Sequence, residues 1–152
     1  MASQTDRIEK QTVVRAPLAK VWNALGDPAE FGAWFGLKLE GSFTPGARVK
    51  GKLTNPEYAH LTFEIDLAEV VPQELFSYRW HPYAIDPKVD YSQEPTTRIE
   101  FRLEEVKEGT RVTIVESGFD AIPAERRAET FRMNDDGWTQ QIENLARHAA
   151  AK

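Results

Sequence analysis

Residues 110–150 read TRVTIVESGFDAIPAERRAETFRMNDDGWTQQIENLARHAA. The range Thr110–Phe119 alternates apolar and polar side chains, which is typical of a β-strand with one buried face. Asp120–Pro123 follows as a hinge, and the rest keeps apolar side chains at three- and four-residue steps, as a helix on a core does. The stripe of that helix consists of Ala124, Ala128, Phe131, Trp138, Ile142, Leu145 and Ala149, with Asp135 as its charged position. This order predicts a long C-terminal helix packed against a sheet.

The residues before this stretch predict an antiparallel meander with two short helices near its start. Ile8–Arg15 is rich in β-branched residues and predicts a first strand. Pro17 and the pair Asp27-Pro28 are typical of helix starts, so two short helices should follow that strand. Alternating segments separated by turn signals such as Thr44-Pro45-Gly46 predict the remaining strands. The sequence therefore predicts an α+β fold in which a curved antiparallel sheet of six to seven strands surrounds the long helix.

Composition limits the classes of protein to which this chain can belong. A length of 152 residues suits one domain, which we expect to cover residues 8–150 after a polar tail at residues 1–7. The net charge of -5 and the scattered basic residues argue against nucleic acid as a partner. The absence of cysteine excludes disulfides, thiolate metal ligands and cysteine-bound iron–sulfur clusters.

Localisation and cofactors follow from what the sequence lacks. Residues 1–11 are polar, and no apolar run approaches the roughly 20 residues needed to cross a bilayer, so we expect a cytoplasmic protein without membrane insertion. His60, His81 and His148 are far apart and show no ligand spacing, so we expect no metal site. No Gly-x-Gly-x-x-Gly segment follows a predicted strand, and we expect no cofactor.

Short motifs in a fixed order resemble a known family over nearly the whole chain. They are Ala16-Pro17 with Val21-Trp22, then Trp34, Leu75–Tyr78 with Trp80, Gly109-Thr110 with Val112 and Ile114, Ser117-Gly118-Phe119, and Gly137-Trp138 with Leu145. Together they resemble the START-like superfamily, also called SRPBCC, and within it the branch named after the activator of the heat-shock-protein-90 ATPase. The resemblance implies a helix-grip fold with a cavity between the sheet and the long helix. It also implies relatives that bind lipids, hormones or polyketides, with a minority acting as cyclases or hydrolases.

Aromatic side chains are the first candidates for a site. They fall on the apolar phases of the predicted strands and helices, so they should converge in one interior. Such residues either fill the core or line a pocket, and the sequence leaves both possibilities open. The aromatic candidates for ligand binding are Trp34, Phe43, Phe63, Tyr78, Trp80, Phe101, Phe131 and Trp138.

Three polar residues complete the set of candidates. Glu116 continues the inward phase of Val112 and Ile114, where a carboxylate could recognise a ligand or transfer a proton; the alternative is a solvated position at the rim of the sheet. Asp135 lies on the helix stripe, although a local helix break would turn its carboxylate to water. His81 begins a proline-containing loop and could contact a ligand.

These observations favour the binding of an apolar or aromatic small molecule in an internal cavity. The first alternative is a cofactor-free cyclase, dehydratase or hydrolase that uses Glu116, Asp135, His81 or Tyr78, although no catalytic motif such as Gly-x-Ser-x-Gly is present. The second is a chaperone or signalling accessory protein that binds a protein partner through its surface. The sequence is compatible with a monomer and with a homodimer.

Overall fold

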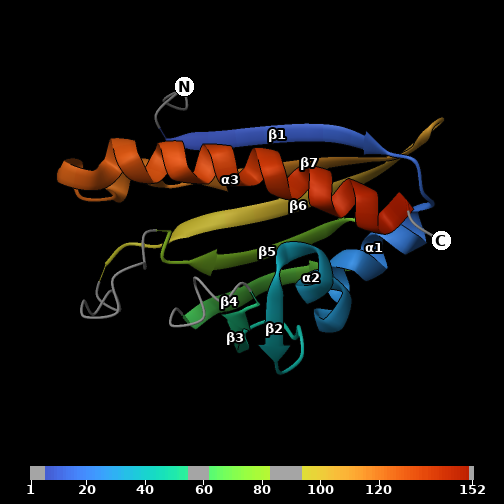
Figure 1. The fold of residues 1–152 in the computed structure, drawn as a ribbon, viewed down its shortest axis with the longest axis horizontal. Coiled ribbons are helices and arrows are strands. Elements are labelled where there is room, and N and C mark those ends of the chain that lie inside the picture. The colour runs from blue at the N-terminus through green and yellow to red at the C-terminus, as the bar shows by residue number, and fades with distance from the viewer. Residues whose placement is uncertain (1–5, 55–61, 83–93, 151–152) are drawn as a thin grey trace.

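The computed structural model describes residues 6–54, 62–82 and 94–150. In this part of the chain the strands form one antiparallel sheet of seven strands in the order β1-β7-β6-β5-β4-β3-β2. The long helix α3 lies along one face of the sheet over β1 and β7, and α1 and α2 follow β1 at one end (Figure 1). The strands are β1 Arg7–Val14, β2 Leu37–Glu40, β3 Arg48–Leu53, β4 Thr62–Val71, β5 Leu75–Trp80, β6 Thr97–Val106 and β7 Gly109–Ser117, and the helices are α1 Leu18–Gly26, α2 Pro28–Phe35, the short 3₁₀ turn η2 Phe119–Ala121 and α3 Ala124–Ala150. The predicted α+β helix-grip architecture is confirmed.

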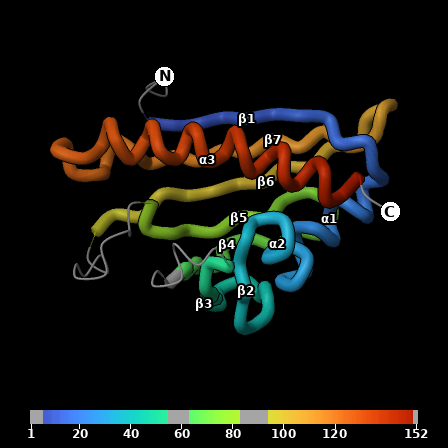
Figure 2. Tube along the Cα trace, viewed as in Figure 1, coloured from blue at the N-terminus to red at the C-terminus, as the bar shows by residue number. Residues whose placement is uncertain are grey.

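Local signals explain where the two short helices begin and end. The Asp27 side chain accepts a hydrogen bond of 2.9 Å from the backbone N–H of Ala29, and Pro28 occupies the first turn of α2. Gly36 ends α2 in the left-handed conformation, with φ of 93°. The chain then turns directly into β2, which contacts α2 at the sheet edge opposite β1 (Figure 2).

The core lies between the concave face of the sheet and the helices. On β7 the buried residues alternate from Thr110 to Glu116, as the strand period of two requires. The same alternation on β6 buries Ile99 and Phe101. These inward side chains face Trp138, Ile142 and Leu145 of α3, which are also buried.

The structure of the helix α3 differs from two expectations drawn from the sequence. It continues without interruption from Ala124 to Ala150, so the predicted alternative of a break near residue 135 is wrong. Its inward face in the first half follows Thr130, Asn134 and Trp138 at four-residue steps, instead of the predicted positions 131 and 135. One residue along a helix rotates the side chain by about 100°. Phe131 is therefore only half-buried and packs against Phe119, and Asp135 is turned toward β1.

None of the helices in residues 6–54, 62–82 and 94–150 combines the length and apolar character needed to span a membrane. Most of the predicted loop at residues 81–95 lies outside the described residues, which include only His81, Pro82, Glu94 and Pro95 of it.

Candidate functional site

Glu116 is a fully buried carboxylate in the middle of an apolar row of the sheet. It pairs with Ile8 of β1 on one side and with Ile99 of β6 on the other, and Ile99 pairs with Tyr78 of β5. Paired residues share a face, so all four side chains point toward α3. The exposed fraction of Glu116 is 0%. The predicted inward orientation of Glu116 is therefore correct, and the alternative of a solvated rim position is wrong.

Four donors from three elements surround the Glu116 carboxylate. Its Oε1 accepts hydrogen bonds from the indole Nε1–H of Trp138 at 2.7 Å and from Asn134 Nδ2 at 3.0 Å. Its Oε2 accepts from the indole Nε1–H of Trp80 at 2.8 Å, from Thr97 Oγ1 at 2.5 Å and from Asn134 Nδ2 at 3.1 Å. Each oxygen therefore has at least two donors. The carboxylate ties α3 to strands β5 and β6 through these contacts.

The electrostatic state of the site follows from burial and from these donors. Burial raises the pKa of Glu116 above its ordinary value, and the hydrogen bonds from Thr97, Trp80, Trp138 and Asn134 offset part of that rise. None of the ion pairs formed among the described residues includes Glu116. Within the described part of the chain, the carboxylate is held by neutral dipoles and not by a cation.

Tyr78 is the second buried polar group of this row. Its hydroxyl is fully buried and has no hydrogen-bond partner among the described residues. Burial and, to a smaller extent, the charge of Glu116 raise the pKa of Tyr78 well above its ordinary value. The hydroxyl therefore stays protonated and is a buried polar group that a bound molecule or a water could satisfy.

A hollow of about 110 Å³ lies next to Glu116, between α2, α3 and the end of β5. The rings of Trp80 and Trp138 lie 5.8 Å apart between centroids, and the Phe35 ring lies 6.4 and 6.1 Å from them. A Cβ added at Gly137 would meet no atom within 4 Å, so the helix leaves open space at this position. The lining residues are Phe35, Trp80, Met133, Asn134, Gly137, Trp138 and Gln141.

Most of the predicted aromatic candidates belong to one continuous cluster of rings. Phe31 is central to it, with ring centroids 4.8 Å from Trp34, 5.6 Å from Phe43 and 6.4 Å from Phe101. Phe35 connects this group to Phe63 at 5.5 Å. Of the predicted aromatic ligand residues, Trp80 and Trp138 line the hollow, whereas Trp34, Phe43, Phe63, Tyr78 and Phe101 pack into the core.

Three predicted site residues lie outside this constellation. The carboxylate of Asp135 is 2.9 Å from Lys10 Nζ of β1, and its side chain is 41% exposed. His81 is half-buried, and its Nε2 lies 3.2 Å from the backbone oxygen of Glu94. Phe131 packs on Phe119 with centroids 5.1 Å apart. The expectation that Asp135 faces the same interior as Glu116 is wrong, because the inward face of α3 passes through Asn134 instead. Phe131 does pack against the core, through Phe119, but it does not line the hollow.

The sequence analysis missed Phe35, Thr97 and Asn134. Asn134 is four residues before Trp138, so it lies on the same helix face, and that spacing was a usable signal. Thr97 pairs with Trp80 across β5 and β6, which becomes visible only when the strand register is known. Phe35 is the last residue of α2, and its direction depends on how α2 packs against α3.

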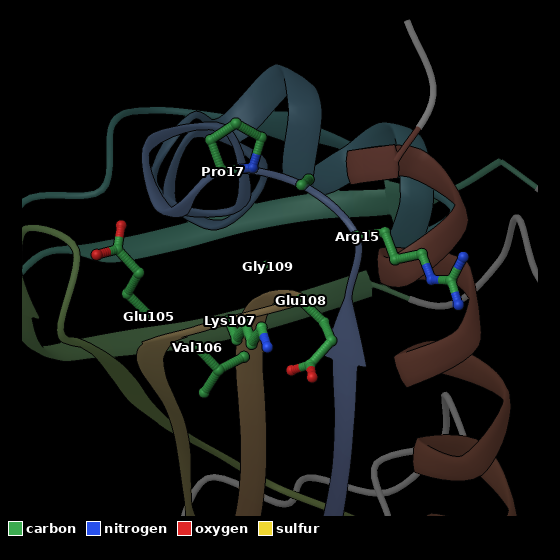
Figure 3. Close-up of a pocket in the computed structure, with 8 residues that line it drawn as sticks. Arg15, Pro17, Glu105, Val106, Lys107, Glu108 and Gly109 are labelled. Atoms are coloured by element: carbon green, nitrogen blue, oxygen red, sulfur yellow. The ribbon is translucent and has the colours of Figure 1, made fainter.

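A larger hollow of about 890 Å³ lies at the opposite end of β7, but its lining does not form a site. Its residues come from the β1–α1 connection and the β6–β7 hairpin, and the side chains of Arg15, Glu105 and Glu108 point in different directions (Figure 3). None of the polar side chains among its described lining residues is buried. Among the described residues, no three His, Cys, Asp or Glu side chains are grouped as a metal site would require. The hollow beside Glu116 is therefore the candidate site.

The sheet that curves around a long C-terminal helix defines the class of protein to which this chain belongs, the helix-grip proteins of the START-like superfamily. Residues 15–150 match the family model described as Activator of Hsp90 ATPase homolog 1-like protein, and the chain belongs to this family, abbreviated AHSA1. No curated protein matches the sequence.

Solved structures share the fold of this chain. DynU16, described as a putative protein in the dynemicin biosynthetic locus, is 25% identical with a TM-score of 0.71, and the match covers 93% of this chain and 46% of that one. This chain therefore spans less than half the length of DynU16. Protein MLL2253 from Mesorhizobium loti is 24% identical with a TM-score of 0.73, covering 93% of this chain and 95% of that one. The Aha1 dimer from Colwellia psychrerythraea is 15% identical with a TM-score of 0.67, covering 91% and 92% of the two chains, and shows the fold alone.

Proposed function

We propose that this protein binds an apolar or aromatic small molecule in the hollow beside Glu116. The observation that carries the proposal is an aromatic wall formed by Phe35, Trp80 and Trp138 next to a buried carboxylate. Sites for small molecules combine a mainly apolar lining with a few placed polar groups. The hollow also lies between the sheet and the long helix, where the resemblance to START-like proteins implies a ligand.

The size of the hollow limits what enters it in this conformation. Ordinary ligand pockets measure about 300–1,000 Å³, and the described residues leave about 110 Å³ here. The hollow therefore takes a fragment of a ligand, while the rest would lie at its mouth. Each 100 Å² of apolar surface that leaves water contributes about 2.5 kcal/mol, so binding of a single fragment is expected to be weak.

The geometry gives less support to proton transfer by Glu116. Both carboxylate oxygens already accept two or more hydrogen bonds, so a substrate would have to displace a donor before reaching them. Asp135 and His81 do not contact the hollow in the described part of the chain. Recognition of a bound molecule requires no such displacement, and we therefore favour binding over catalysis.

The test is a titration with phenol, a neutral aromatic probe, followed by NMR of the tryptophan indole N–H groups. The signals of Trp80 and Trp138 should shift together with one dissociation constant. The indole of Trp34 donates to the backbone oxygen of Ala24 at 2.8 Å, away from the hollow, and its signal should move least. Saturating phenol without a shift of the Trp80 and Trp138 signals would contradict the proposal.

A substitution in the helix separates binding from folding. Gly137→Leu places a side chain in the open space at the hollow and should weaken phenol binding at least about tenfold. Glycine is less favourable than alanine in a helix by roughly 0.8–1 kcal/mol, and leucine ranks just below alanine, so stability should not fall. Glu143→Leu introduces the same side chain at an exposed position of α3 and should leave binding unchanged. Equal binding by both variants would place the phenol elsewhere.

A further inference from the structure

The charge of Glu116 suggests which ligands the hollow prefers, an inference that rests on the proposed function. We propose that the site selects a small molecule that presents an organic ammonium group to the faces of Trp80 and Trp138. The cation would be attracted by the carboxylate behind the two indoles without touching it. The class of ligand is therefore an organic cation with an apolar surface, in preference to a neutral molecule of the same shape.

The first feature that favours a cation is the charge of Glu116. The indole N–H groups of Trp80 and Trp138 are donors only, as is the Nδ2 of Asn134. All three point at Glu116 and need its lone pairs, which an ionised carboxylate supplies at both oxygens. No ion pair among the described residues neutralises this charge, and the nearby Lys10 is paired with Asp135. With no counter-ion among the described residues, this buried negative charge attracts a cation more than a solvated carboxylate does.

The second feature that favours a cation is the aromatic wall. Trp80 and Trp138 line the hollow and also hold Glu116, so their positive N–H edges are turned toward the carboxylate. A hydrogen bond to an anion polarises the donor group, which leaves more negative charge on the rest of the ring. Cations are attracted to the faces of such rings within about 6 Å of the centroid, and more strongly when water is excluded. Phe35 adds a third ring at 6.1 and 6.4 Å from the two indoles.

A cation also has an advantage over a neutral hydrogen-bond donor at this site. To use the charge of Glu116, a ligand hydroxyl would have to bond to the carboxylate directly, and both oxygens of Glu116 are occupied by Trp80, Thr97, Asn134 and Trp138. A cation acts through its field and displaces none of these donors. None of the described side chains that line the hollow is charged, so none of them repels a cation. The net charge of -5 also favours the approach of a cation.

The size of the hollow matches a small ammonium group. A volume of about 110 Å³ is somewhat smaller than the roughly 150 Å³ of a cavity that accepts benzene. An ammonium nitrogen with methyl or methylene substituents fits this space, and the open side at Gly137 leaves room for the rest of a larger molecule. Both Met133 and Gln141 lie at the lining and contribute no charge.

The experiment compares two probes of equal size, tetramethylammonium and tert-butanol, in the same NMR titration of the indole N–H groups. In the unsubstituted protein, tetramethylammonium should bind at least about tenfold more tightly than tert-butanol. Glu116→Gln should reduce this preference to about threefold or less, because the charge behind the rings is gone. Glu100→Gln is the matched control, since Glu100 lies on the outer face of the sheet with Arg98 and Arg102, and it should keep the preference.

The outcomes separate this inference from the proposed function. Equal binding of the two probes, or tighter binding of tert-butanol, overturns the preference for a cation, while binding of phenol at Trp80 and Trp138 leaves the proposed function standing. Absence of binding by all three probes overturns both. If Glu116→Gln does not fold, the comparison of the two probes on the unsubstituted protein still decides the question.

Discussion

Replacing Glu116 by glutamine keeps the shape of the side chain and changes what it offers to its neighbours. A carboxamide has one acceptor oxygen, whereas the carboxylate accepts hydrogen bonds at both oxygens. Asn134 can turn its amide oxygen toward the new NH₂ group, and the Thr97 hydroxyl can accept from it. The indoles of Trp80 and Trp138 cannot accept, so in either amide orientation one buried indole N–H loses its partner.

This mismatch between donors and acceptors sets how much the free energy of unfolding falls in Glu116→Gln. A buried donor left without an acceptor costs about 1–3 kcal/mol. The hydrogen bonds that remain have a neutral acceptor instead of a charged one, which reduces the contribution of each to stability from about 1.5–3 to about 0.5–1.5 kcal/mol. Removing a buried charge offsets part of this loss. We expect Glu116→Gln to lower the free energy of unfolding by about 2 kcal/mol and the melting temperature by about 4–8 °C.

The assay is urea unfolding followed by circular dichroism near neutral pH, with Glu100→Gln as the control. Glu100 is only partly buried and pairs with Arg98 and Arg102, so the same substitution there should cost less than about 1 kcal/mol. A Glu116→Gln protein as stable as the original, or more stable, would refute the reasoning. It would mean that a neutral amide satisfies the four donors as well as the carboxyl group does.

Two further predictions concern the same network. Because burial raises the pKa of Glu116, the folded state binds the proton of Glu116 more tightly than the unfolded state does. The contribution of Glu116 to stability is therefore full at acid pH and is lost as pH rises through the folded-state pKa. The stability difference between the original protein and Glu116→Gln should therefore grow from about pH 7 toward about pH 4.5 in urea unfolding, and a constant or shrinking difference would contradict this sign. Asn134→Ala removes a donor from Glu116 and should cost about 1–2 kcal/mol, whereas Asp135→Ala removes a half-exposed ion pair and should cost less than about 1 kcal/mol. Thermal unfolding of the two variants checks this order, and an equal or larger loss for Asp135→Ala would show that the helix face is assigned incorrectly.

The elements of the fold were predictable because their signals are local. Asp27-Pro28 and Gly36 mark the two ends of α2, since capping and left-handed turns depend on the residues at those positions. The alternation of β7 likewise predicts which side chains share a face, and it places Glu116 with Val112 and Ile114. The order of these elements along the chain then leaves few arrangements besides a sheet around the last helix.

The site depended on information that a linear pattern does not carry. The donors to Glu116 lie 18 to 36 residues away from it in the sequence, and they meet there only through the register of β5, β6 and β7 and the rotation of α3. That rotation turns Asn134 toward Glu116 and Asp135 toward Lys10 of β1, although a stripe with steps of three and four residues places Asp135 on the inward face. The side chains packed around a helix decide which of its faces turns inward, and a change of one residue in that choice rotates the helix by about 100°. The amino-acid pattern of this chain therefore determines its helices and strands and the inward side of each strand. Tertiary packing decides the rest: the partners of Glu116, the inward face of α3 and the hollow beside Trp80 and Trp138.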